Sequence, residues 1–299
     1  MKPSLSVLMP AYNAEATIAA SVRSALRSLP KDGELLVFID GGKDNTLGVL
    51  SSIHDVRLKV HNSPDNVGVV RARQFLFEWA NADYVATLDS DDLAMPWRFR
   101  SQLRTIKRTG ADFVFGNAIL FGEGLGFFKA RPEWPVALNT RQSKISLAFT
   151  NPFINSAMLA RKSAISKIGG FKGEIEDLGM WLEAAAEDLA VVRTASYAVC
   201  YRVHPTQLSR TSAWKNSLES DPLLLQMRDQ YKASVESPII AKGSADPVFD
   251  LWKEYALGSF GLMMQNIGIK DYLKYRVTGL LRDQNREYRQ TRKRGSDVR

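Results

Sequence analysis

The sequence has very little cysteine, and it has neither a long apolar run nor a leader-like start. Cys200 is the single cysteine among 299 residues, so a disulfide framework is excluded and a reducing compartment is favoured. No stretch reaches the roughly 18 consecutive apolar residues of a membrane-spanning helix. The apolar run at 5–9 is too short for a secretory signal and ends at Pro10. These absences predict a protein that stays in the cytoplasm.

Positive and negative charges nearly balance over most of the chain. Forty Lys and Arg residues against 32 Asp and Glu residues give a formal net charge of +8, but residues 282–299 alone hold seven cations and three anions. Half of the excess therefore lies in this tail. Such a tail can attract anionic lipid or nucleic acid. We expect no nucleic-acid binding, because no recognised nucleic-acid module accompanies the tail.

The first 100 residues show a regular alternation of two patterns. Short apolar runs alternate with segments whose apolar residues recur every three or four positions. They predict strands at 5–9, 35–39, 57–60 and 84–88, and helices at 18–29, 47–53 and 70–79. Strands that are apolar throughout and alternate with helices are typical of a mostly parallel sheet covered on both faces. The predicted fold class is therefore α/β.

The pattern changes further along the chain. It predicts helices at 95–107 and 174–187, a loop at 122–126, and strands at 113–120, 154–160, 191–193 and 198–203. From about residue 212 the strand signals stop, and the predicted helices are 218–230, 247–264 and 270–282. We therefore predict an α/β domain over 1–211, with halves 1–100 and 101–211, and a helical extension with a basic tail over 212–299.

Polar side chains follow three of the predicted strands. Tyr12 and Asn13 follow the first, Asp40 the second, and the run Asp89-Ser90-Asp91-Asp92 the fourth. In open α/β sheets, ligands bind outside the carboxyl ends of the strands. Carboxylates two residues apart can converge on Mg²⁺ or Mn²⁺, which completes its shell with substrate phosphates. The competing interpretation is a simple turn with a helix-capping aspartate.

Six short motifs occur in a fixed order between Leu5 and Ser209. They are Ser6-Val-Leu-Met-Pro-Ala-Tyr-Asn13, Asp40-Gly-Gly-Lys-Asp-Asn-Thr46, Asn66-Val-Gly68 with Ala72-Arg73, Asn81-Ala-Asp-Tyr-Val-Ala-Thr-Leu-Asp-Ser-Asp-Asp92, Gly170-Phe171 with Glu176-Asp177, and Tyr201-Arg-Val-His-Pro205. In this order and spacing the chain resembles glycosyltransferase family 2, the inverting nucleotide-sugar-dependent enzymes with the GT-A fold. Two positions depart from the family pattern: Asp40 stands where two aspartates are common, and Gln74 stands where Asn is usual.

The resemblance implies a site for a nucleotide-sugar donor, with UDP as the expected nucleotide. It assigns base and ribose contacts to the first two motifs, phosphate or ribose contacts to the third and fourth, and a divalent cation to the D-x-D. The donor residues so implied are Pro10, Ala11, Tyr12, Asp40, Arg73, Asp89 and Ser90. The cation, Mn²⁺ or Mg²⁺, is expected at Asp91, Asp89 and His204. For Arg73 a structural role competes with phosphate contact, and for His204 a surface position competes with ligation.

The resemblance also implies an acceptor side. Asp177 is expected to be the catalytic base that takes the proton of the attacking sugar hydroxyl. Glu176 is expected to orient the acceptor or its own helix. Trp181 lies one helical turn beyond Asp177, where it would wall the acceptor pocket or pack in the core.

The leading hypothesis is therefore a metal-dependent inverting transfer of a hexose to a saccharide or lipid-linked saccharide, as in surface polysaccharide synthesis. One alternative is a degenerate fold that binds or assembles without turnover. The other is a sugar-nucleotide pyrophosphorylase, which would need a Gly-rich phosphate loop where the Pro10–Asn13 turn stands.

The extension has two interpretations of its own. Aromatic residues at helical spacing over 249–260 favour a helix that packs on the catalytic domain or on a second subunit, which would give a homo-oligomer. The alternative is an interfacial helix that, with the basic tail, holds the enzyme peripherally on anionic lipid at the inner face of the membrane.

Overall fold

The computed structural model describes residues 2–123, 130–149, 151–173, 175–205, 207 and 211–240, and these build a mixed nine-stranded sheet with helices around it. The first four strands lie parallel in the order β3-β2-β1-β4, which confirms the predicted α/β fold. They are β1 (Ser6–Ala11), β2 (Glu34–Asp40), β3 (Leu58–Ser63) and β4 (Tyr84–Thr87). All residues of β1 and β2 are buried, because helices cover both faces of these strands.

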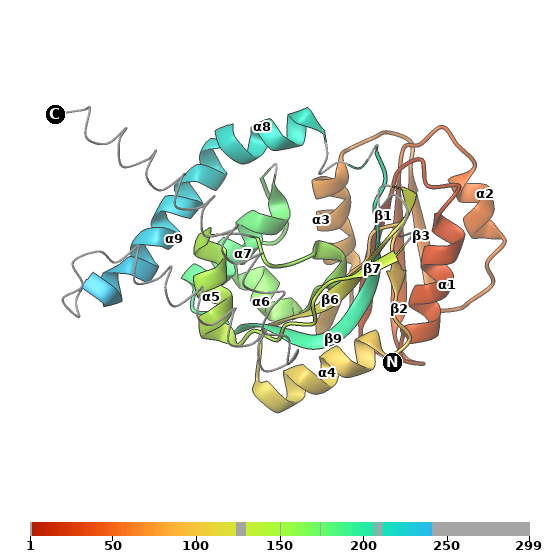
Figure 1. Cartoon of the computed structure of the whole chain (residues 1–299). Coiled ribbons are helices and arrows are strands. Elements are labelled where there is room, and N and C mark those ends of the chain that lie inside the picture. The colour runs from red at the N-terminus through yellow and green to blue at the C-terminus, as the bar shows by residue number, and fades with distance from the viewer. Residues whose placement is uncertain are drawn as a thin grey trace. The chain divides into compact units, whose positions relative to one another are not determined.

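The helices of this half lie on both sides of β1 and β2. Figure 1 shows α1 (Ile18–Ser28) and α3 (Val69–Trp79) on opposite faces, and α2 (Thr46–Ser51) lies beside α1. The chain places β2 on one side of β1 and β4 on the other, so the strand order reverses at β1. A reversal of this kind leaves a crevice at the carboxyl ends of the strands. The polar residues that follow β1, β2 and β4 therefore share one edge of the sheet.

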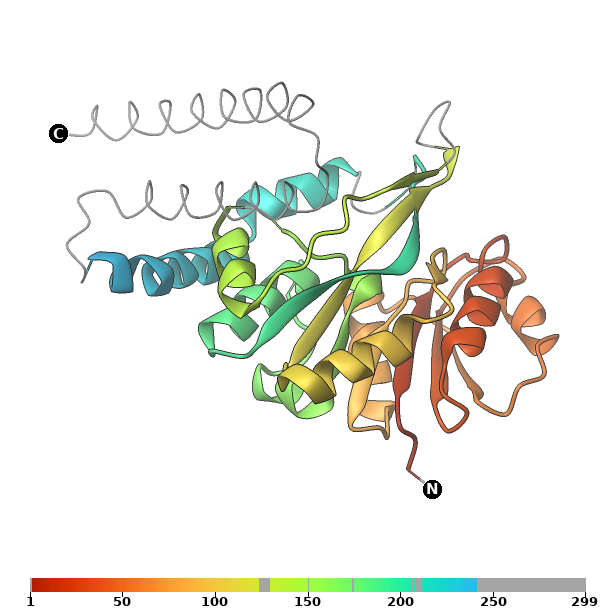
Figure 2. The ribbon, with the colours of Figure 1, turned by 60° about the horizontal axis from the view of Figure 1, so that its bottom comes forward.

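The second half of the sheet contains antiparallel pairs. β8 (Leu159–Arg161) lies antiparallel between β4 and β6 (Phe113–Phe121), and the long β9 (Val191–Arg202) runs parallel to β6 (Figure 2). Two short strands complete it, β5 (Leu93–Ala94) on β9 and β7 (Ala130–Pro132) on β6. The remaining helices before residue 211 are α4 (Arg98–Thr109), α5 (Thr140–Phe149), α6 (Lys162–Lys167) and α7 (Glu176–Ala186).

Several sequence predictions need correction in this half. The two short strands expected at 191–193 and 198–203 are one strand, β9. It pairs with β6 along its length, and shifts in register around Asn117 accommodate the polar residues in the middle of β9. The strand expected at 154–160 begins with a 3₁₀ turn, η2 (Asn155–Ala157), before β8. The sequence prediction did not include β5, β7, α5 or α6, whose apolar periodicity is weak. The loop expected at 122–126 lies largely outside the described residues.

Two helices follow the sheet. The helix expected at 218–230 is divided into α8 (Ser212–Ser220) and α9 (Pro222–Ile240), because Pro222 begins a new helix and the Asp221 carboxylate accepts the N–H of Leu223 (2.9 Å). α9 packs against α5 and α7. The chain divides after Tyr255 into two units, and all described residues belong to the first. The helices expected at 247–264 and 270–282 lie outside the described residues. Among the described helices, none has the length and apolar character needed to cross a bilayer.

Candidate active site

Hydrogen bonds join the loops at the carboxyl ends of β1 and β2. The Asn13 side-chain oxygen accepts the N–H of Lys43 (2.9 Å), and the Thr46 hydroxyl oxygen accepts the N–H of Ala14 (2.9 Å). Asp44 accepts the N–H of Glu15 (2.8 Å). The first contact joins the first two motifs, and the other two join the second motif to the residues directly after the first. Much of their polar character therefore serves to hold the two loops together.

Asp40 links the second motif to the third. Its side chain is only 3% exposed, and its two oxygens accept the N–H groups of Val67 (2.6 Å) and Gly68 (3.0 Å). Gly68 immediately precedes α3. The carboxylate therefore fixes the start of α3, and its expected contact with the nucleotide stays a prediction.

Gly41, which follows Asp40, can be replaced only at a cost that we expect to measure. Its φ is +64°, and a Cβ would lie 2.4 Å from the backbone of Asp65 and Asn66. We expect Gly41→Ala to lower the free energy of unfolding by about 2–3 kcal/mol or more. The matched control is Gly110→Ala, because Gly110 has φ +72° and open space around it, so only the backbone cost of about 1 kcal/mol applies. Equal losses in the two variants, measured by chemical denaturation, would contradict the close approach.

The residues expected to line the nucleotide lie at the end of β1. Pro10 and Ala11 are buried strand residues, whereas Tyr12 directly after them is 55% exposed. An exposed ring at the carboxyl edge of a parallel sheet is free to stack on a planar ligand. Tyr12 is thus exposed at this edge, and its contact with a nucleotide stays a prediction.

The acidic turn after β4 is held from three sides. The N–H of Asp89 donates to the Ser156 hydroxyl oxygen (3.0 Å), and the carbonyl of Ser90 accepts the hydroxyl of Ser21 (2.8 Å). Asp91 Oδ2 lies 3.1 Å from His204 Nε2. Asp92 Oδ1 accepts the N–H of Arg202 (2.7 Å). The fourth and sixth motifs are therefore brought together across 113 residues of sequence.

Burial and mutual repulsion govern the charges of this turn. Burial and the charge of Asp89 raise the pKa of Asp91, and the hydrogen bond with His204 opposes them. Burial and the charges of Asp91 and Asp89 raise the pKa of Asp92 well above its ordinary value. Three carboxylates crowded into one turn favour the binding of a positive group.

Arg73 supplies one positive charge from α3. Its guanidinium forms ion pairs with Asp89 Oδ1 (2.6 Å) and with Glu176, and the side chain is almost fully buried. With its amide oxygen turned toward the guanidinium, Asn155 accepts a further hydrogen bond from Nη2 (3.0 Å). Arg73 is thus engaged by protein groups, which favours the structural role over the phosphate contact.

Glu176 and Asp177 begin α7 and have different surroundings. Glu176 is 7% exposed and is committed to Arg73, so it orients its helix. Asp177 Oδ1 accepts the N–H of Leu178 (2.6 Å), and Asp177 forms no ion pair with any described residue. Burial raises the pKa of Asp177 above its ordinary value, with Asp89 adding to the rise and Leu178 and Arg73 opposing it. Of the two acids, Asp177 is therefore the one without an ion-pair partner among the described residues, and its role as the base stays a prediction.

α3 also holds the turn that leads to these two acids. The Gln74 side-chain oxygen accepts the N–H of Phe171 (2.9 Å), and the Phe171 ring meets Phe77 edge-on at 6.0 Å. Gln74, a departure from the family pattern, therefore anchors the Gly170-Phe171 motif. Arg73 and Gln74 are adjacent on one helix, which was the only sign in the sequence of this shared role. Their partners Glu176 and Phe171 lie about a hundred residues further along the chain.

Trp181 requires a correction. Its side chain is 0% exposed and packs edge-on against Phe115 (4.8 Å between ring centroids) and Phe113 (6.2 Å). A side chain with no exposed surface cannot wall a pocket, so the alternative of core packing holds for Trp181.

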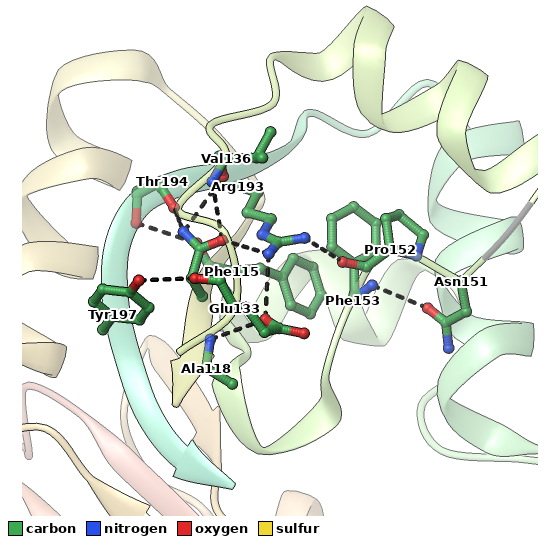
Figure 3. A network of polar contacts seen from close by, with 11 residues as sticks. Phe115, Ala118, Glu133, Val136, Asn151, Pro152, Phe153, Arg193, Thr194 and Tyr197 are labelled. Atoms are coloured by element: carbon green, nitrogen blue, oxygen red, sulfur yellow. Dashed lines mark hydrogen bonds and ion pairs between the residues drawn. The ribbon is translucent and has the colours of Figure 1, made fainter. Parts of the chain in front are cut away.

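A polar network missed by the sequence prediction orders the segment that follows β7 (Figure 3). Arg193 donates to the carbonyl of Pro152 (2.9 Å) and to Asn117, and it forms an ion pair with Glu133 (3.3 Å). The Tyr197 hydroxyl donates to the Glu133 carbonyl (2.8 Å). The network ties Glu133, Val136 and Pro152 to β6 and β9, and Pro152 lies shortly before Asn155 and Ser156 at the acidic turn. Arg193, a cation inside a predicted strand, was the available signal.

A divalent cation requires several oxygen or nitrogen ligands around one point. Within the part of the chain that the structure describes, no three His, Cys, Asp or Glu side chains are gathered to enclose a metal ion by themselves. Asp91 and His204 offer one carboxylate and one imidazole at the site edge. Mg²⁺ is commonly held by one or two carboxylates together with substrate phosphates, and Mn²⁺ accepts oxygen and imidazole ligands. The pair therefore fits a cation that is bound jointly with a diphosphate.

Comparison with known proteins identifies the family. The model for "Glycosyl transferase family 2" matches residues 6–169, which is more than half of the chain and includes the first four motifs. The chain belongs to glycosyltransferase family 2. The matched region ends before Glu176, Asp177 and His204, so the roles of these three residues rest on the geometry above.

Similar proteins include bacterial glycosyltransferases, two of which are named for a specific reaction. The UDP-Glc:alpha-D-GlcNAc-diphosphoundecaprenol beta-1,3-glucosyltransferase WfgD of Escherichia coli is 34% identical over 113 residues, which are 38% of this chain and 45% of that protein. The Escherichia coli enzyme WfaP, whose name states the same reaction, is 24% identical over 69% of this chain and 79% of its own length. An uncharacterized glycosyltransferase of Haemophilus influenzae is 32% identical over 62% of this chain and 73% of its own length. The chain thus spans less than half of WfgD.

Solved structures confirm the GT-A fold of this family 2 member. TarS of S. aureus, residues 1–349 in complex with UDP-GlcNAc, superposes with a TM-score of 0.59 at 16% identity and covers 85% of this chain and 81% of that one. The complex of the same fragment with UDP gives a TM-score of 0.56 at 21% identity, covering 68% and 61%. At these identities the likeness concerns the fold alone.

Proposed function

We propose that this protein transfers a hexose from a UDP-linked sugar to a saccharide carried on a lipid diphosphate, with inversion at the anomeric carbon. The observation that carries the proposal is the meeting of the acidic turn, Arg73 and Asp177 at the carboxyl edge of the sheet. The names of WfgD and WfaP state UDP-Glc as donor and a diphosphoundecaprenol-linked GlcNAc as acceptor. TarS has been solved with UDP and with UDP-GlcNAc. These names support the donor and acceptor classes.

The donor is expected to lie along the edge from Tyr12 to the acidic turn. Tyr12 stacks on the base, and the turn faces the diphosphate. Asp91 and His204 would hold a Mn²⁺ or Mg²⁺ ion together with the diphosphate, and such an ion neutralises charge that develops on the leaving group. Asp89, which forms an ion pair with Arg73, contacts the ribose or the diphosphate of the donor in this proposal.

Asp177 performs the proton transfer in this proposal. The acceptor hydroxyl oxygen forms a bond to the anomeric carbon while the bond from that carbon to the diphosphate oxygen breaks on the opposite face. Asp177 accepts the hydroxyl proton, and nucleoside diphosphate leaves with the electron pair. Arg73 and Glu176 keep the start of α7, and with it Asp177, in place beside the turn.

The pH dependence of turnover follows from the surroundings of Asp177. Only the ionised carboxylate accepts a proton, and burial together with Asp89 raises its pKa. We expect kcat/KM to fall as the pH drops through this raised pKa, by about tenfold per pH unit below it. Steady-state rates across the acidic range test this expectation, with circular dichroism at each pH as the control for folding. A flat profile in folded protein would contradict the assignment of the base.

The proposed reaction is tested by incubating the full chain with Mn²⁺, a panel of nucleotide sugars and a synthetic lipid-linked GlcNAc diphosphate. We expect release of UDP, a product heavier by one hexose, and an inverted anomeric configuration by NMR. Thermal-shift measurements against the same panel identify the donor without an acceptor. Binding of a UDP-sugar without turnover on any acceptor would support the binding-subunit alternative, and formation of a nucleotide sugar from a sugar phosphate would support the pyrophosphorylase.

The expected membrane contact and homo-oligomer depend on segments beyond residue 240, outside the described residues. Both stay proposals. A lipid-linked acceptor would make peripheral attachment useful, because the basic residues of 282–299 would bring the site close to an anionic surface.

A further inference from the structure

A buried arginine that the proposed reaction does not use lies beneath the acidic turn. Arg98 is the first residue of α4 and is 1% exposed. Burying a guanidinium is costly unless protein groups compensate its charge and hydrogen-bonding capacity. The groups that do so at Arg98 therefore show what the residue holds in place.

Arg98 and Gln102, one helical turn apart, bind carbonyl groups from three strands or turns. Arg98 Nη2 donates to the carbonyls of Thr87 (2.7 Å) and Met158 (3.1 Å), and its Nε donates to the Gln102 side-chain oxygen (3.2 Å). Gln102 Nε2 donates to the carbonyls of Ala157 (2.7 Å) and Val114 (3.0 Å). The pair thus fixes the end of β4, the η2–β8 segment and β6 relative to one another.

The carbonyls so fixed belong to the two segments that build the acidic turn. Thr87 lies two residues before Asp89, and Ala157 follows Ser156, whose hydroxyl oxygen accepts the N–H of Asp89. A displacement of either segment would move Asp89 and Asp91 together. Arg98 therefore supports the turn from within the core.

Charge links Arg98 to the same turn. Burial lowers the pKa of Arg98 to about 9, and the charges of Asp92 and Asp89 oppose this fall. Asp92 is as deeply buried as Arg98, and its Oδ1 accepts the N–H of Arg202, two residues before His204. Arg98 Nη1 and Asp92 Oδ2 have no hydrogen-bond partner among the described residues, and the negative charge of Asp92 favours the charged form of Arg98.

We propose that Arg98 is a positioning residue that fixes the acidic turn for the donor diphosphate and supplies a buried positive charge beneath it. The proposal rests on the proposed function, because the diphosphate is the ligand for which the turn is held. It distinguishes Arg98 from an ordinary core residue: its loss affects donor binding more than it affects the chemical step, since Asp177 lies on α7.

The test compares Arg98→Met, Arg98→Lys and the control Arg161→Met in the full chain. Arg161 contacts the opposite end of the same sheet region, where its Nε donates to the carbonyl of Ala111 (3.2 Å). At saturating Mn²⁺ we expect the dissociation constant for UDP to rise about tenfold or more in Arg98→Met, to rise less in Arg98→Lys, and to stay within about twofold in Arg161→Met. Donor KM is expected to rise more than kcat falls.

A folded Arg98→Met variant that binds UDP as the wild type does would overturn the proposal, whatever its melting temperature. If Arg98→Met does not fold, Arg98→Lys decides, because lysine keeps the charge but lacks the planar guanidinium and the Nε donor to the Gln102 side chain. If the wild type itself does not bind UDP, the proposed function fails and deuterium exchange becomes the readout. Faster exchange confined to 84–94, 155–161 and 198–205, with 34–40 unchanged, would then support the positioning role, and unchanged exchange would refute it.

Discussion

Asp177→Asn is expected to lower kcat by about 100- to 10,000-fold, because the amide cannot accept the proton of the attacking hydroxyl. The substitution keeps the size of the side chain and one oxygen for the N–H of Leu178. Binding of the donor should therefore change by less than about twofold, since its predicted contacts lie on other loops. The loss should appear in the chemical step alone.

The measurement is single-turnover transfer at saturating donor and acceptor, with UDP binding measured in parallel. Asp188→Asn is the matched control, because Asp188 is an exposed acid just beyond the other end of α7. The assignment of Asp177 as base is wrong if the Asn variant turns over at a rate near that of the control. A parallel loss of UDP binding would instead indicate that Asp177 supports the donor site.

Arg73→Met is expected to lower the free energy of unfolding by about 3–5 kcal/mol, because it leaves the Glu176 carboxylate buried without its positive partner. Asp89 loses its ion pair in the same step. Both the acidic turn and the start of α7 then lose the group that joins them. We expect turnover to fall even in conditions where the variant is folded.

A double-mutant cycle separates the two effects. Arg73→Met with Glu176→Gln removes both buried charges, so most of the lost stability should return by chemical denaturation. Turnover should not return, because no ion pair then joins the start of α7, which carries Asp177, to Asp89 in the acidic turn. Full recovery of turnover in the double variant would show that Arg73 has no positioning role.

The sequence predicted the order of elements well where local patterns are strong. The apolar runs that became β1 to β4, and the periodic segments that became α1 to α3, form because each segment carries its own signal. β9 was predicted in two pieces because polar residues in its middle interrupt the apolar pattern. The register shifts that accommodate them depend on β6, which no local window contains.

The sequence predicted which types of residue belong to the candidate site, but not which of them already bond to other protein groups. The family resemblance assigned Asp91, His204, Arg73 and Glu176 to one site. The structure brings Asp91 to His204 and Arg73 to Glu176, although 113 and 103 residues separate the members of each pair. The sequence does not show which polar groups already have partners. In the structure, Asp40 and Arg73 bond to protein groups and Trp181 is fully buried. These outcomes depend on long-range packing, so a local sequence pattern does not reveal them. Arg98 carried no motif signal at all, since its role arises from carbonyls of distant segments.

The central claim is that the acidic turn binds a nucleoside diphosphate with the help of a cation at Asp91 and His204. Calorimetric titration of UDP into the wild type and into Asp91→Asn, each with Mn²⁺ and with a chelator, tests it most directly. The wild type should bind UDP more tightly with Mn²⁺, by about tenfold or more, and Asp91→Asn should lose this gain while staying folded. Equal UDP affinity in all four titrations would contradict the account.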